Sequence, residues 1–84
     1  MTRRLIQSAA QLSVLLKTAR KARRLSQAAV ATQVGVSTNR YSELEGDAGA
    51  LTVERFLAIA RELGLEVYVS NAAPPPADAP TSSW

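Results

Sequence analysis

The sequence of 84 residues contains no cysteine and no histidine. Without cysteine the chain forms neither a disulfide nor a thiolate metal site. Without histidine it lacks the commonest general base and the commonest metal ligand. The serine and aspartate residues that remain supply no base-activated nucleophile. We therefore expect no enzyme activity, no bound metal and no cofactor.

Long apolar runs are also missing from the sequence. No stretch approaches the about 20 apolar residues that a membrane-spanning helix needs, and the first four residues lead into no secretory signal segment. We expect a protein without membrane contact, cytoplasmic and nucleoid-associated, of bacterial type. The length is enough for one domain, but such a chain buries only about 60% of its unfolded surface. Dimerisation is therefore a physically reasonable source of further stability.

Acidic residues are absent from the first half of the chain. Residues 1–40 carry eight basic side chains and no acid, and residues 41–84 carry two basic side chains and seven acids. The formal charges of the two halves are thus +8 and −5. A face that is merely solvated would mix the two signs. The asymmetry favours a polyanion as partner, and we interpret it as the mark of a nucleic-acid interface.

Two longer helices are predicted at the ends of the region with helical periodicity. Ser8 and Gln11 have the form of a capping box, and apolar residues recur at helical spacing over about residues 9–23. Thr52 caps another helix, which ends at Gly64. We expect six residues of this last helix to face inward: Val53, Phe56, Leu57, Ile59, Ala60 and Leu63.

Two short helices joined at a glycine are predicted between these longer ones. Ser26 caps the first, and Gly35 ends it because glycine adopts a positive φ without a Cβ penalty. Ser37 or Thr38 caps the second, which runs through Glu45. Generic helix pairs also turn at a glycine, so the turn alone is weak evidence. The whole segment, with short polar residues opening its second helix, is typical of a helix-turn-helix that reads the major groove.

Residues 65–70 change to an alternating pattern of β-branched and aromatic residues, which predicts a strand. A single strand cannot satisfy its own backbone, and the sequence predicts no other strand. The simplest partner is the same strand of a second copy, and the alternative is a frayed end. We predict these residues as the dimer strand: Glu66, Val67, Tyr68 and Val69. The domain then covers residues 1–70, and residues 71–84 form a disordered tail rich in proline, alanine and serine.

Several short motifs carry a family resemblance. They are Leu12 and Leu16, Arg20, Leu25-Ser26-Gln27, Val34-Gly35-Val36-Ser37, Leu44-Glu45-Gly46 and Phe56-Leu57. Through them the chain resembles the lambda-repressor-like (Xre-type) helix-turn-helix family over about residues 11–63. Within that family it is similar to HipB-type antitoxins, through the passage from helix to strand over residues 63–67 and a polar tail with a final tryptophan.

The resemblance implies a mainly α fold, a bundle of four to five helices with a short C-terminal strand that pairs across a homodimer. It also implies a sequence-specific DNA-binding repressor that is the antitoxin of a type II toxin–antitoxin system. Such a protein neutralises a HipA-like Ser/Thr kinase and autoregulates its operon, and its two-fold symmetry predicts a palindromic double-stranded operator. The alternatives are a solo Xre-type regulator without a toxin and a protein-interaction module that does not bind DNA.

The resemblance also assigns DNA-binding roles by position. Gln27 bonds a backbone phosphate and braces the recognition helix, and Arg40 is expected to contact phosphate rather than a base. The residues expected to face the major groove are Ser37, Thr38, Asn39 and Ser42. Asn39 is the residue that we most expect to read a base, since a carboxamide pairs bidentately with adenine.

Other positions carry structural expectations or depart from the family pattern. In the family, the pair Arg20 and Glu45 forms a partly buried salt bridge between the first helix and the recognition helix. Arg24 stands where glycine is usual, which strains that turn or lengthens the helix. Tyr41 stands where Ile or Val is typical, and its hydroxyl needs a partner or solvent.

The two ends of the chain leave alternatives open. Arg3 and Arg4 either reach phosphates or form a mobile basic end. Trp84 is expected to anchor the tail in a partner protein, because tryptophan dominates small interfaces. The alternative for the tail is disorder without function.

Overall fold

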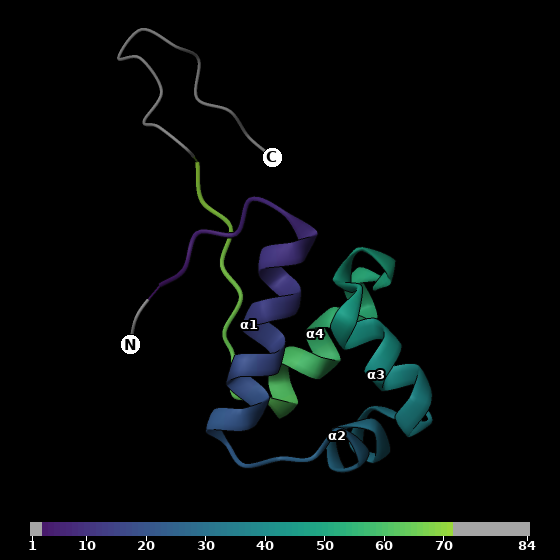
Figure 1. The fold of residues 1–84 in the computed structure, drawn as a ribbon. Coiled ribbons are helices and arrows are strands. Elements are labelled where there is room, and N and C mark those ends of the chain that lie inside the picture. The colour runs from purple at the N-terminus through teal and green to yellow at the C-terminus, as the bar shows by residue number, and fades with distance from the viewer. Residues whose placement is uncertain (1–2, 72–84) are drawn as a thin grey trace, which may run out of the picture.

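Four helices in the described part of the chain surround one small core (Figure 1). The computed structural model describes residues 3–71. Within them the helices are α1 (Ala9–Ala22), α2 (Gln27–Val34), α3 (Thr38–Gly46) and α4 (Val53–Glu62), and the 3-10 turn η1 (Ala48–Ala50) joins α3 to α4. The prediction of a mainly helical helix-turn-helix bundle is confirmed.

A hydroxyl side chain fixes the start of every one of these four α-helices. Each accepts a hydrogen bond from the backbone N–H three residues later, which satisfies one of the donors that a helix N-terminus leaves free. The pairs are Ser8 with Gln11, Ser26 with Ala29, Ser37 with Arg40 and Thr52 with Arg55, at 3.2, 3.0, 3.0 and 3.1 Å. The cap of α3 is thus Ser37 and not Thr38.

Three helices end in the same way, with one residue in the left-handed region. These residues are Arg24, Gly35 and Gly64, with φ of 58°, 76° and 71°. In each case the next N–H donates back to a carbonyl five residues earlier: Leu25 to Arg20, Val36 to Ala31 and Leu65 to Ala60, at 3.1, 3.0 and 2.8 Å. This is the Schellman arrangement, which usually has glycine at the left-handed position. Of the two alternatives for Arg24, the strained turn is the one observed, since α1 ends at Ala22.

Each helix contributes one large side chain to the centre of the core. Leu16 of α1, Val30 of α2, Tyr41 of α3 and Ile59 of α4 are all at most 1% exposed. Burying an aliphatic side chain of this size contributes about 1.5–3 kcal/mol. These side chains anchor the inner side of α3, through Tyr41, in the core, and the opposite side of α3 remains exposed to solvent.

The inward face of α4 is narrower than the sequence predicts. Ile59, Ala60 and Leu63 are buried and Phe56 is partly buried, but Val53 is 74% exposed and Leu57 46% exposed. The prediction for Val53 and Leu57 is therefore wrong for the single chain. The reason is that these residues, four apart, lie on one side of the helix that no other described element covers.

Residues 65–70 leave α4 as an extended segment that returns along α1 (Figure 1). Among residues 3–71 no strand is formed. The predicted pairing of residues 66–69 requires a second copy of the chain and stays a prediction. Apart from Asn71 the expected tail, with Trp84, lies outside the described residues. None of the helices in the described part is long and apolar enough to cross a membrane.

Candidate nucleic-acid interface

Helices α2 and α3 pack against each other across a short turn at one edge of the molecule (Figure 1). The turn consists of Gly35, Val36 and Ser37. Gly35 has open space around it, so its left-handed φ and not crowding requires glycine there. The turn sets α3 across α2, and α2 in turn packs on α4. This is the arrangement of a helix-turn-helix.

The two sides of α3 differ sharply in exposure. Tyr41, Leu44 and Glu45 are at most 4% exposed and anchor the helix to the bundle. The exposed residues are Ser37, Thr38, Asn39, Arg40, Ser42 and Glu43. All the expected groove-facing positions therefore lie on the solvent side, including the carboxamide of Asn39. A helix with this face outward fits a major groove about 12 Å wide.

Three of these exposed residues already have partners in α3 or at its N-cap: Ser37, Arg40 and Glu43. The Ser37 hydroxyl accepts from the Arg40 N–H, so it has its proton left to donate to a ligand. The Arg40 guanidinium lies 3.7 Å from the Glu43 carboxylate, and both side chains are more than half exposed. An exposed pair of this kind contributes about 1 kcal/mol or less, so Arg40 is free to turn to a phosphate.

A buried ion pair joins α1 to the C-terminal end of α3. Arg20 Nε donates to Glu45 Oε2 at 2.8 Å and Arg20 Nη2 donates to Glu45 Oε1 at 3.1 Å. The two side chains are only 10% and 3% exposed. Arg20 Nη1 also donates to the Leu25 carbonyl oxygen at 2.8 Å, which adds the α1–α2 connection to the network. One guanidinium thus fixes three segments.

Gln27 completes this network from the start of α2. Its Nε2 donates to Glu45 Oε1 at 3.3 Å, and the residue is half-buried. Through this hydrogen bond Gln27 can brace the recognition helix α3, as the resemblance implies. The amide keeps a second N–H, which is available to a phosphate.

The electrostatics of the network follow from burial and pairing. Burial alone would raise the pKa of Glu45, but the hydrogen bonds from Arg20 and Gln27 hold this pKa below its usual value. The hydrogen bond with Glu45 raises the pKa of Arg20 against the effect of burial. Burial and the neighbouring Glu45 raise the pKa of Tyr41 well above its ordinary value. Its hydroxyl oxygen makes no hydrogen bond within the described part of the chain.

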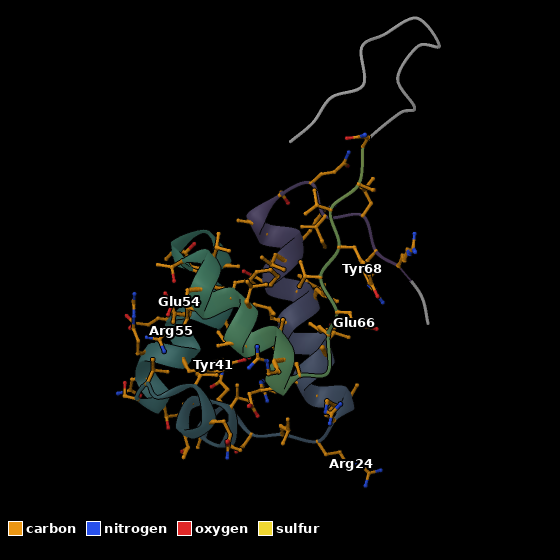
Figure 2. The ribbon with its side chains drawn as sticks, turned by 180° about the vertical axis from the view of Figure 1, so that it is seen from behind. Arg24, Tyr41, Glu54, Arg55, Glu66 and Tyr68 are labelled. Carbon is orange, nitrogen blue, oxygen red and sulfur yellow. The ribbon has the colours of Figure 1, made fainter. Side chains whose placement is uncertain are left out.

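Basic side chains gather where α1 meets α2. Lys17, Lys21, Arg23 and Arg24 are all exposed on the last turns of α1 or just after it. Figure 2 shows Arg24 reaching away from the body beside the α1–α2 connection. Basic side chains near a helix-turn-helix generally raise its affinity for nucleic-acid phosphates, whatever the base sequence.

The N-terminal arginines lie elsewhere. The Arg3 guanidinium lies over the ring of Tyr68, 5.6 Å from its centroid. This places the N-terminal segment beside the extended residues 65–70, on the side of the molecule opposite α3 (Figures 1 and 2). Arg3 is therefore not brought to the helix-turn-helix within one copy.

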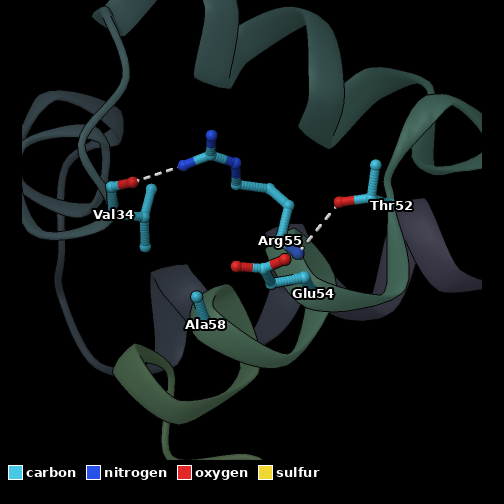
Figure 3. Close-up of a pocket in the computed structure, with 5 residues that line it drawn as sticks. All are labelled: Val34, Thr52, Glu54, Arg55 and Ala58. Atoms are coloured by element: carbon cyan, nitrogen blue, oxygen red, sulfur yellow. Dashed lines mark hydrogen bonds between the residues drawn. The ribbon is translucent and has the colours of Figure 1, made fainter.

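Arg55 of α4 makes a structural contact that the sequence analysis did not predict. Its Nη1 donates to the carbonyl oxygen of Val34, at the C-terminal end of α2, beside the Thr52 cap (Figure 3). It thereby satisfies a carbonyl that a helix end leaves free. The contact borders a shallow hollow of about 370 Å³ that Glu54 and Ala58 also line. The contact spans 21 residues, and no local sequence signal marks it.

Groups able to hold a metal are not present in the part that the structure describes, where no three Asp or Glu residues come together. The candidate site is the exposed polar side of α3, whose side chains can form hydrogen bonds and carry charge.

Comparison with known proteins points to one family. The helix-turn-helix family HTH_3 matches residues 16–69. Among solved structures, the chain is similar to a HipB variant in complex with an O2 20mer, with 25% identity, a TM-score of 0.76 and coverage of 86% of this chain and 100% of that one. It is also similar to a chain of a HipA-HipB-O2-O3 complex, with 22% identity, a TM-score of 0.75 and coverage of 84% and 100%. A third similar structure is an MDT protein, with 24% identity, a TM-score of 0.75 and the same coverage. No curated protein matches the sequence.

Proposed function

The chain belongs to the helix-turn-helix family HTH_3, and from this premise we propose that it is a sequence-specific DNA-binding repressor and the antitoxin of a type II toxin–antitoxin system. The observation that supports DNA binding is the difference between the buried and the exposed side of α3. Its apolar and ionic side, with Tyr41, Leu44 and Glu45, is buried against the bundle, and its short polar side chains face solvent. A repressor works on the chromosome, so its place is the bacterial cytoplasm, at the nucleoid.

In the proposed complex α3 lies in the major groove of double-stranded DNA. Asn39 reads a base, and Ser37, Thr38 and Ser42 contact base edges around it. Arg40 and the second N–H of Gln27 bind phosphates and so fix the position of the helix on the duplex. The protein thus acts as a binding protein rather than as an enzyme.

A homodimer would supply the second half of the recognition surface. Val53 and Leu57 are exposed on α4, and the extended residues 66–69 have no strand partner in one copy. Both features are explained if a second copy covers them and pairs with Glu66, Val67, Tyr68 and Val69. A two-fold dimer sets two α3 helices about one DNA turn apart, so its operator is palindromic.

The antitoxin role rests on the likeness to HipB. One of the similar structures is a HipA-HipB-O2-O3 complex, and the chain of it that matches is covered in full. We extend this to a HipA-like Ser/Thr kinase as toxin partner, with autoregulation of the shared operon. Trp84, outside the described residues, is the proposed anchor for the kinase.

A solo Xre-type regulator is the alternative function. The observation that favours it is that every proposed DNA contact lies within the family match, whereas the kinase contact is assigned to the tail. Co-purification of the chain with the product of a neighbouring kinase gene, expressed from the native operon, separates the two. A stable complex supports the antitoxin role, and a chain that binds its promoter but no kinase supports the solo regulator.

DNA binding is tested by fluorescence anisotropy with the chain's own upstream DNA and a random duplex. Wild type should prefer its own promoter, and Asn39→Ala should lose about 1–3 kcal/mol of that preference. Arg40→Ala should instead weaken both duplexes alike and reduce the salt slope by about 1. Gln33→Ala, at an exposed position of α2, is the matched control and should bind as wild type. A wild type without preference, as expected for a protein-interaction module, would refute the proposal.

A further inference from the structure

The N-terminal segment, residues 3–6, lies beside the extended residues 65–70 in both views of the molecule (Figures 1 and 2). The contact between the Arg3 guanidinium and the Tyr68 ring joins the two segments. Tyr68 also donates through its hydroxyl to Glu66 Oε2 at 3.0 Å, which fixes its ring on the segment. Two stretches from the opposite ends of the domain therefore form one surface.

This surface holds most of the large apolar side chains that the described residues expose. Five of the eight are here: Leu5, Ile6, Val67, Tyr68 and Val69. Leu5 is 79% exposed and Val69 93% exposed. Single exposed apolar residues are normal on a protein surface, but a cluster indicates a site of contact. The cluster is thus the strongest candidate for a covered face.

The backbone of the surface is also open. Within the described part, residues 3–6 and 66–70 take part in no hydrogen bond between backbone groups. Extended segments with free N–H and C=O groups are the surfaces to which a further strand adds. The occupant must therefore offer extended backbone as well as apolar side chains.

A second copy of this chain meets these conditions. In a two-fold dimer the same patch meets itself, so a patch must complement its own charges. Here Arg3 lies on one segment and Glu66 on the other, and both contact Tyr68. We propose that residues 3–6 are part of the dimer interface and brace residues 66–69 for pairing, so that the N-terminal segment is an interface element and not a DNA-binding arm. The inference rests on the homodimer proposed above.

The test is the dimer dissociation constant of the full-length chain, measured by sedimentation equilibrium. Leu5→Ser should raise it by about tenfold or more, since burial of a leucine side chain is lost in each copy. Arg3→Ala should raise it about threefold, as expected for an exposed cation–π contact. In the Tyr68→Leu background Arg3→Ala should have no further effect, which shows that Arg3 acts through the ring.

Two controls separate this inference from the proposed function. Arg4→Ala removes the same charge at a residue without such a contact in the described part, and Asn39→Ala changes the DNA-facing side, so both should dimerise as wild type. If wild type is a dimer and Leu5→Ser dimerises equally well, this inference is overturned while the repressor proposal stands. The same holds if Leu5→Ser keeps the dimer but loses the kinase, because the face then belongs to another partner. A wild type that remains a monomer refutes the homodimer itself.

Discussion

Replacing Arg24 with glycine should make the protein more stable, although it removes a charged side chain. Arg24 has a φ of 58° at the end of α1, where the equivalent residues after α2 and α4 are Gly35 and Gly64. The left-handed conformation costs an L-residue about 1–2 kcal/mol. Glycine avoids this cost, but its larger conformational freedom in the unfolded chain lowers the free energy of unfolding by about 0.5–1 kcal/mol. We expect Arg24→Gly to gain about 0.5–1 kcal/mol.

The assay is urea unfolding followed by circular dichroism at one fixed protein concentration, because the stability of a dimer depends on concentration. The midpoint should rise with an unchanged slope, and Tm should rise by about 2–8 °C. Arg23→Gly is the matched control, with the same change of charge at the neighbouring residue, whose φ is −91°. It should bring no gain, because no left-handed strain is relieved there.

The converse substitution, from glycine to alanine at a left-handed position, can be made at Gly35 in the turn between α2 and α3. A Cβ on Gly35 would meet no atom within 4 Å, so Gly35→Ala tests the conformation alone and should cost about 1 kcal/mol. If Arg24→Gly were no more stable than Arg23→Gly, the argument from backbone strain would be wrong.

Three further predictions concern the buried network. Glu45→Ala should lower stability by about 3–5 kcal/mol, because it leaves Arg20 buried without its carboxylate; an unchanged Tm would contradict the pairing. The lowered pKa of Glu45 also fixes a pH dependence. The unfolded chain binds this proton near the ordinary value of 4.5, so the stabilisation is present above that pH and is lost as the pH falls through the lower folded value. Thermal unfolding between about pH 7 and about pH 3 should therefore show a steeper loss for wild type than for Glu45→Gln. Tyr41→Phe should raise stability by up to about 1 kcal/mol, because a buried hydroxyl without a partner is removed; a lower Tm would show that the hydroxyl bonds Glu45.

Much of the fold was predictable because its signals are local. A serine or threonine cap acts within four residues, and the positive φ of Gly35 is a property of that residue, so helix starts and the turn follow from short stretches of sequence. The exposed side of α3 was predictable for the same reason. Once Tyr41 and Leu44 face the core, helical periodicity turns Asn39 outward.

The features that the sequence did not predict depend on contacts between distant segments. The helical spacing of Val53 and Leu57 predicted that both face the core, but both are exposed. Which apolar side of α4 is covered depends on where the other helices lie. The Arg55 contact with the Val34 carbonyl and the Arg3 contact with Tyr68 join residues far apart in the chain.

The buried network of Arg20, Gln27 and Glu45 and the proposed DNA-reading residue Asn39 are connected through the same helix, α3. Asn39 and Glu45 are six residues apart on α3, about 9 Å along the helix axis. Ser37 fixes the helix at its start, and Arg20 with Gln27 fixes it near its end, so the exposed turn between them has little freedom to lose on binding. A surface that is ordered before it meets its ligand binds with less loss of entropy. The buried ion pair therefore contributes to the proposed recognition without touching DNA, by holding in place the helix that carries Asn39.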